Sequence, residues 1–232
     1  MELLMIVPSR GRPQNVAALW ESWQATTTAS ADLLVCVDDD DPELDAYRQG
    51  WEAAGGCDGY RLQTGPRLRL GGTLNAASRV YAEHYRAIGF LGDDHRPRTA
   101  AWNERFLSTL DGLGTGLVYG NDLIQGRLLP TAVAMSSDIV RTLGYMVPPG
   151  LTHLYIDSAW LALGQTLDRL TYLPDVVIEH MHPLVGKAPS DAGYEEVNSS
   201  AMYAADSQAY EAWVRDRLDN DVTKLKELME RG

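Results

Sequence analysis

Two carboxylates and an imidazole stand together where an apolar run of the sequence stops. The run at residues 87–91 (AIGFL) is followed, after Gly92, by Asp93, Asp94 and His95. A solvated turn explains these residue types, because Asp and Gly are common in turns. A divalent-metal site explains them equally well, because open α/β sheets bind ligands at the carboxyl ends of their strands. The other polar clusters of the chain must decide between a turn and a metal site.

Four consecutive aspartates, at residues 38–41, end a second apolar run. One or two of them can cap the helix that follows, because the positive end of a helix favours acidic side chains. Four in a row exceed what capping needs, and they repel one another unless cationic or hydrogen-bonding groups lie nearby. A nucleoside supplies such groups through a base N–H and ribose hydroxyls. We therefore expect Asp38 or Asp39 to contact a nucleoside.

A pair of histidines lies on one face of a predicted strand at residues 170–183. Alternation along residues 176–182 places Val176, Ile178, His180 and His182 on the same side. A histidine on an apolar face is more often a satisfied core residue than a ligand. That reading weakens because the acids and the imidazole at residues 93–95 still need partners. Mixed carboxylate and imidazole ligation suits Mn²⁺ or a related divalent ion.

A single carboxylate, Asp157, follows the aromatic and apolar stretch HLYI at the start of a predicted helix. It can be an N-cap, since Asp is among the favoured cap residues. It can also be a partly buried carboxylate with a raised pKa, which could act as a general base. The sequence favours these two roles about equally.

Positive charge is concentrated in the stretch RLRLGGTLNAASR, at residues 67–79. Arg67 and Arg69 precede Gly71 and Gly72, which we expect to form a turn that lets the backbone approach a ligand before a helix begins. The stretch matches neither the phosphate-binding pattern GxxxxGK[ST] nor the dinucleotide fingerprint GxGxxG.

The elements that must position these residues alternate along the first hundred residues. Apolar runs at 3–7 (ended by Pro8), 31–38, 60–65 and 87–91 predict strands, and helical patterns separate them. This predicts a mostly parallel α/β sheet with helices on both faces. The polar clusters at 8–10, 38–41 and 93–95 then fall on one edge of the sheet and converge. Further along, we expect strands at 116–122 and 129–135, a helix capped by Ser136 or Ser137, a mobile loop from 186 to about 203, and one amphipathic helix over 207–230.

The bulk composition narrows the class of protein. The chain has 232 residues and a formal net charge of −12, which disfavours a broad nucleic-acid or anionic-membrane surface. Of the two cysteines, Cys36 lies in an apolar run and is expected to be a buried free thiol, which fits a reducing compartment. The start of the sequence lacks a signal-peptide pattern and no apolar stretch is long enough for a membrane span, so we expect a cytoplasmic protein.

Six stretches in this order resemble glycosyltransferases of the GT-A fold, closest to the family 2-like group of bacterial and phage enzymes. They are IVPSRGRPQNV, VCVDDDDPE, GGTLNAASR, GFLGDDHRP, YIDSAW and IEHMHP, within residues 3–185. The resemblance implies one Rossmann-like GT-A domain over 1–232, with a nucleotide-binding half (1–100), an acceptor half (101–185) and a flexible loop and C-terminal helix (186–232). It also implies a metal-dependent, inverting transfer of one sugar from a UDP-type donor to an acceptor hydroxyl.

The resemblance also assigns roles to residues of this chain. It places Asp157 as the catalytic base and Asp94 as a ligand of Mn²⁺ or Mg²⁺, with His180 favoured over His182 to complete the metal site. It places the donor against Pro8, Ser9, Arg10, Asp38, Asp39, Arg69, Asn75 and Asp93. Beyond the resemblance, we expect the mobile segment from 186 to about 203 to close over the donor, with Lys187 reaching the diphosphate.

The sequence departs from the family pattern in three places. Gly92 stands where the DxD-type motif often begins, which leaves the choice among His95, His180 and His182 open. Ile156 replaces the usual acidic residue beside the base. The QxxRW motif of processive members is missing, which favours a single transfer.

Two other functions compete with this one. A nucleotidyltransferase can share the sheet and the paired aspartates, but PSRGRPQN lacks the lysine that such an enzyme needs. A non-catalytic module of the same fold that binds a sugar nucleotide or a glycan is compatible with Gly92. The acceptor is expected to be a glycan, a protein or a small molecule, while the net charge disfavours modified DNA. A phage origin would place the protein in the host cytoplasm.

Overall fold

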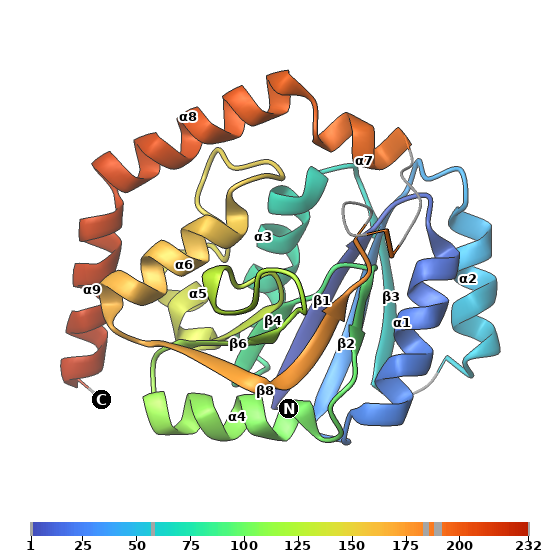
Figure 1. Cartoon of the computed structure of the whole chain (residues 1–232), viewed down its shortest axis with the longest axis horizontal. Helices are drawn as coiled ribbons and strands as arrows, with labels where there is room; N and C mark the ends of the chain where they lie inside the picture. The colour runs from blue at the N-terminus through green and yellow to red at the C-terminus, as the bar shows by residue number, and fades with distance from the viewer. Residues whose placement is uncertain (1, 57–58, 183–185, 188–191, 232) are drawn as a thin grey trace.

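In the computed structural model, residues 2–56, 59–182, 186–187 and 192–231 are described, and they form an eight-stranded sheet with helices on both faces (Figure 1). The strand order is β3-β2-β1-β4-β7-β6-β8-β5. The strands are β1 (Leu3–Ser9), β2 (Ala31–Asp38), β3 (Tyr60–Gly65), β4 (Ala87–Phe90), β5 (His95–Pro97), β6 (Leu117–Asn121), β7 (Val133–Ser136) and β8 (Leu170–His180). The α-helices are α1 (Pro13–Thr26), α2 (Leu44–Ala53), α3 (Arg69–Tyr81), α4 (Trp102–Leu113), α5 (Ser137–Leu143), α6 (Ile156–Leu167), α7 (Ala192–Val197), α8 (Ser200–Asp216) and α9 (Leu218–Arg231), and a 3₁₀ turn spans Gly126–Leu128.

The predicted mostly parallel sheet is confirmed. β1 pairs in parallel with β2 and β4, and β2 with β3. β7 runs antiparallel between β4 and β6, and β5 pairs antiparallel with β8. The parallel strands bring the residues that follow β1, β2 and β4 to one edge of the sheet, where α7 lies over them (Figure 1).

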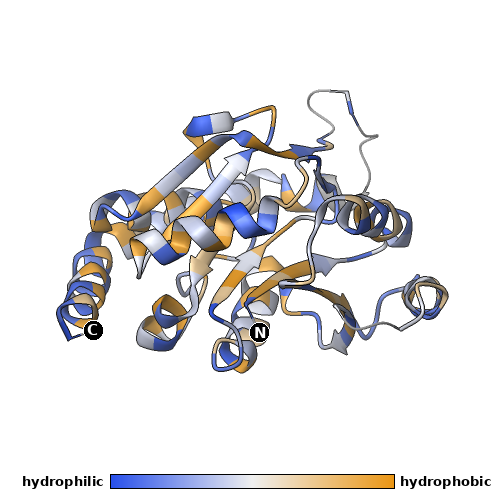
Figure 2. Ribbon diagram, turned by 90° about the horizontal axis from the view of Figure 1, so that it is seen from below, coloured by the Kyte–Doolittle hydropathy of each residue, from blue (hydrophilic) through white to orange (hydrophobic). Residues whose placement is uncertain are grey.

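The continuous apolar run of β1 is explained by two hydrophobic cores, one on each face of the sheet. Leu3, Met5 and Val7 pack in the core that includes α1, α2 and α4. Leu4 and Ile6 face the core that includes α3, α5, α6 and the α8–α9 pair. Figure 2 shows the strands as hydrophobic segments in the interior, with helices that are hydrophobic on one side. Because successive side chains of a strand point to opposite faces, a strand covered on both sides reads as an unbroken apolar run.

Some predicted boundaries were wrong. β1 continues through Pro8, which is tolerated because the pairing of β1 with β4 ends at Ile6 and leaves one side of the strand without a neighbour. Gly71 and Gly72 do not form a turn, because α3 already begins at Arg69. Helix α4 and strand β5 lie where the sequence reading placed no element.

The C-terminal part differs most from expectation. Residues 192–197 and 200–203 are helical, so the predicted loop over 186–203 was wrong there, while 188–191 lie outside the described residues. The predicted single helix over 207–230 is two helices, because Arg217 leaves the helical conformation with φ −133°. Ser199 caps α8 by accepting a hydrogen bond from the Met202 amide. Trp213 and Leu225 bury this helix pair against the core that includes α5 and α6.

Two smaller expectations can also be compared with the structure. Cys36 is a buried free thiol, as predicted, while Cys57 lies outside the described residues. Ser136 occupies the N-cap position of α5, although its side chain does not cap the helix. No helix within the described ranges combines the length and apolar character that a bilayer crossing requires.

Candidate active site

A cavity of about 770 Å³ opens at the edge of the sheet where β1, β2 and β4 end. It collects most of the residues singled out from the sequence, namely Pro8, Ser9, Arg10, Asp38, Arg69, Asp93, Asp94, Asp157, His180 and His182. Asp39, Asn75 and Lys187 lie outside its lining. The prediction that the clusters at 8–10, 38–41 and 93–95 converge is therefore confirmed.

Asp93 is fixed at the floor of the cavity by hydroxyl groups. Its Oδ2 accepts a hydrogen bond of 2.6 Å from Ser9, whose Oγ also lies 2.7 Å from the Tyr47 hydroxyl. Burial and the neighbouring charge of Asp94 raise the pKa of Asp93 to about 6. Asp93 is therefore a carboxylate held in place by the protein, facing a space that a polar ligand can enter.

Asp94 and His180 form the closest acid and imidazole pair of the cavity. His180 Nε2 lies 3.3 Å from Asp94 Oδ2. The backbone fixes this contact, because His95 pairs with His180 across β5 and β8, and the Met181 amide donates to the Asp94 carbonyl. The pKa of Asp94 lies below its ordinary value. Burial by itself would raise this pKa, but the hydrogen bond from His180 and nearby positive charge outweigh that effect.

The Asp94–His180 pair fits a divalent cation. Adjacent ligands at about 2.1 Å in an octahedral shell are about 3 Å apart, close to the separation of the two side-chain atoms. Within the described part of the chain, no group of three or more His, Cys, Asp or Glu side chains is gathered as a complete metal site. A cation at Asp94 and His180 would therefore take further ligands from substrate or water.

The two other histidines that the sequence offered as metal ligands, His95 and His182, differ in their surroundings. His95 is 2% exposed, its Nδ1 accepts the Gly92 amide at 2.7 Å, and burial lowers its pKa to about 3. Its ring stacks on His180 at 4.4 Å, whereas the His182 ring meets His180 edge-on at 4.8 Å. His95 is thus a support for the His180 ring, and His182 lies beside the pair on the cavity wall.

Gly92 is required by this arrangement. A Cβ at this position would lie 2.5 Å from Asp94 Oδ1 and 2.8 Å from His95 Nδ1. No side chain fits there without moving the acid or the imidazole. A residue with a side chain at position 92 is therefore incompatible with the observed positions of Asp94 and His95.

Asp157 faces the same cavity from the first turn of α6. It is not the N-cap, because that position belongs to Tyr155, which adopts φ 61°. Its Oδ1 accepts the Ser158 amide at 2.8 Å, and burial raises its pKa above the ordinary value. A raised pKa is a property that a general base needs.

The loop before α6 is clamped from two sides. Asp206 of α8, fully buried, accepts the amides of Thr152, His153 and Leu154 at 2.6–2.9 Å. From α3, the Gly71 amide donates to the Thr152 carbonyl at 2.9 Å. Sequence reasoning missed Asp206 and His153, because no local pattern links α8 to a loop some fifty residues earlier.

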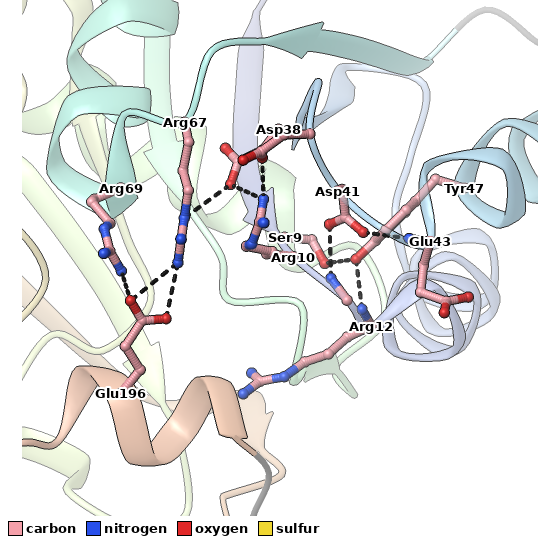
Figure 3. A network of polar contacts seen from close by, with 12 residues as sticks. Ser9, Arg10, Arg12, Asp38, Asp41, Glu43, Tyr47, Arg67, Arg69 and Glu196 are labelled. Carbon is pink, nitrogen blue, oxygen red and sulfur yellow. Dashed lines mark hydrogen bonds and ion pairs between the residues drawn. The ribbon is translucent and has the colours of Figure 1, made fainter.

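Three of the four aspartates at 38–41 have partners within the protein, two of which, Asp38 and Asp41, are labelled in Figure 3. Arg10 Nη1 lies 2.9 Å from Asp38 and 2.5 Å from Asp40. Asp41 accepts the amides of Gly11 and Glu43. Asp38 alone of the run lines the cavity, while Asp39 is exposed away from it. Of the two predicted nucleoside contacts, the structure brings Asp38 to the site.

Two predicted donor contacts have other partners. The Asn75 side chain donates to the Val147 carbonyl and accepts the amides of Met146 and Val147, so it holds the chain after α5. Lys187 forms an ion pair of 2.8 Å with Glu179. Arg69 lies on the cavity rim, where it pairs with Glu196 of α7 (Figure 3).

Comparisons with known proteins identify the fold. No protein-family model and no curated protein matches the chain. The mannosyltransferase PcManGT from Pyrobaculum calidifontis, in complex with GDP-Man and Mn²⁺, is similar with a TM-score of 0.62 at 13% identity, over 96% of this chain and 72% of that one. S. aureus TarS 1–349 in complex with UDP gives 0.59 at 13% identity, over 77% of this chain and 59% of that one.

A third solved structure agrees with these two. Glucosyl-3-phosphoglycerate synthase from Mycobacterium tuberculosis, in complex with Mn²⁺, UDP and phosphoglyceric acid, gives a TM-score of 0.60 at 13% identity, over 90% of this chain and 78% of that one. In the match to the UDP complex, the chain spans less than two thirds of the length of TarS 1–349. Together these similarities establish the GT-A type glycosyltransferase fold that the sequence motifs predicted.

Proposed function

We propose that this protein is a metal-dependent glycosyltransferase that moves one sugar from a UDP-type nucleotide-sugar donor to an acceptor hydroxyl with inversion. One observation carries the proposal: in a GT-A type fold, a single cavity holds the Asp94–His180 pair and the partly buried carboxylate of Asp157. The structures of TarS with UDP and of the mycobacterial synthase with UDP and Mn²⁺ support the choice of donor and metal.

Asp94 and His180 are the residues that would hold Mn²⁺ or Mg²⁺. The bound ion would neutralise the negative charge that develops on the departing diphosphate, without a proton transfer. We place His180 ahead of His182 in this role because the Nε2 atom of His180 already faces Asp94. The stacked ring of His95 keeps His180 in this orientation.

The remaining side chains divide between donor and acceptor. Ser9, Arg10 and Asp38 at the ends of β1 and β2, with Asp93, form the polar wall where we place the nucleoside. Asp157 takes the proton of the acceptor hydroxyl, because an alcohol is a weak nucleophile unless a base assists it. Burial of Asp157 raises its proton affinity toward the value that this step needs.

Calorimetry with UDP, first in EDTA and then in Mn²⁺, tests the metal-dependent donor site. We expect clearly tighter binding in Mn²⁺, and equal affinity in both buffers would contradict the role of Asp94 and His180. Hydrolysis of UDP-sugars in the absence of an acceptor separates an enzyme from a binding module. Binding without any metal-dependent hydrolysis or transfer would favour the module.

A further inference from the structure

Two arginines on the cavity rim share one carboxylate from the C-terminal part of the chain (Figure 3). Arg67 Nη2 lies 2.9 and 3.2 Å from the two carboxylate oxygens of Glu196, and Arg69 Nη1 lies 2.5 Å from Oε1. All three residues line the cavity. Segments about 130 positions apart in the sequence thus meet at the mouth of the proposed donor site.

The two guanidinium groups have the geometry of an anion site. Arginine presents a planar fork of donors that matches the paired oxygens of a carboxylate or a phosphate. Arg69 is also held with φ 62°, a conformation that residues with side chains rarely adopt and that gathers at functional sites. The shared contacts with Glu196 show that Arg67 and Arg69 bring two positive charges to one point on the rim.

The contact between Glu196 and the two arginines is weak enough for another anion to replace it. The side chains of Arg67, Arg69 and Glu196 are 32%, 36% and 43% exposed, so water screens the ion pairs and keeps each of them weak. Glu196 brings one negative charge, whereas a diphosphate brings two or more. A phosphate group entering the cavity can therefore replace Glu196 between the arginines.

We propose that Arg67 and Arg69 form a subsite for a phosphate group, and that Glu196 is a tethered competitor that such a group displaces. The inference extends the proposed function, since the diphosphate of the donor is the anion expected to displace Glu196. Glu196 would then set the affinity for the donor. Only the fraction of molecules in which Glu196 has left the arginines can bind, and the apparent dissociation constant rises by the inverse of that fraction.

The test compares Glu196→Gln with Glu195→Gln, a matched control on the same helix. Both changes remove one negative charge, but no hydrogen bond or ion pair is recorded between Glu195 and either arginine. Calorimetry with inorganic pyrophosphate in EDTA at low salt should show binding about three- to tenfold tighter in Glu196→Gln. Glu195→Gln should stay within about twofold of the parent chain, since it leaves the competitor in place.

Arg69→Gln should weaken pyrophosphate binding both in the parent chain and in the Glu196→Gln variant. Hydrogen exchange of the α7 amides should also speed up when pyrophosphate is added to the parent chain. An equal gain in both glutamine variants would mean a general charge effect and would overturn the tethered role, as would no gain in Glu196→Gln. Because the probe contains no sugar, nucleoside or metal, these results are independent of whether the chain transfers sugar.

Discussion

We expect the substitution Gly71→Ala to disturb the active-site cavity, although Gly71 is not among the residues that line it. A Cβ at Gly71 would lie 2.3 Å from the Leu151 carbonyl oxygen, about 1 Å inside ordinary contact. That oxygen cannot retreat freely, because Asp206 and the Gly71 amide hold the next residues. Overpacking of this kind costs about 1–3 kcal/mol, and alanine returns at most about 1 kcal/mol in helix propensity. We expect a net loss of about 1–2 kcal/mol.

Gly50→Ala is the matched control, since Gly50 lies in α2 with nothing within 4 Å of its Cβ position. At about 2–4 °C per kcal/mol for a chain of this size, Gly71→Ala should lower the melting temperature by about 2–8 °C. Gly50→Ala should raise it by about 2 °C. UDP-sugar hydrolysis should fall in Gly71→Ala alone, because a shift of about 1 Å before α6 misplaces Asp157. A Gly71→Ala protein as stable and as active as the Gly50→Ala control would refute this reasoning.

Three further predictions concern the cavity. Asp94→Asn should abolish the gain in UDP affinity on adding Mn²⁺ while leaving the affinity in EDTA nearly unchanged; calorimetry that still shows the full Mn²⁺ effect would remove Asp94 from the metal site. Asp157→Asn should bind UDP normally and lose turnover, because Asn still accepts the Ser158 amide but cannot take a proton; wild-type turnover with a working acceptor would exclude Asp157 as the base. Burial lowers the pKa of His153 to about 4, so its contribution to stability is complete above pH 6.5 and declines as the pH falls toward 4, by roughly 2 kcal/mol at pH 5. Urea unfolding at pH 7 and pH 5 checks this. The free energy of unfolding should fall less between pH 7 and pH 5 in His153→Gln than in the parent chain, and an identical fall in both would contradict the burial of a neutral His153.

The architecture could be predicted because it depends on local patterns. The apolar runs at β1, β2 and β4, each followed by polar residues, indicated strands buried on both faces and a site at their carboxyl ends. These patterns come from side-chain alternation, which a sequence displays directly. Elements of weaker pattern were missed, such as β5, which has three residues and exists because it pairs with β8.

The partners within the site depend on tertiary contacts. The sequence by itself determined which residue types gather at the sheet edge, including Asp93, Asp94 and His180. It did not show that Asn75 and Lys187 are engaged elsewhere, or that Gly71 packs against a loop of the protein where the sequence reading expected a ligand. Only the fold decided these, because hydrogen bonds and steric fits between distant segments depend on ångström-scale positions that no local pattern encodes. The register of β5 on β8, which sets His180 beside Asp94, is the clearest example.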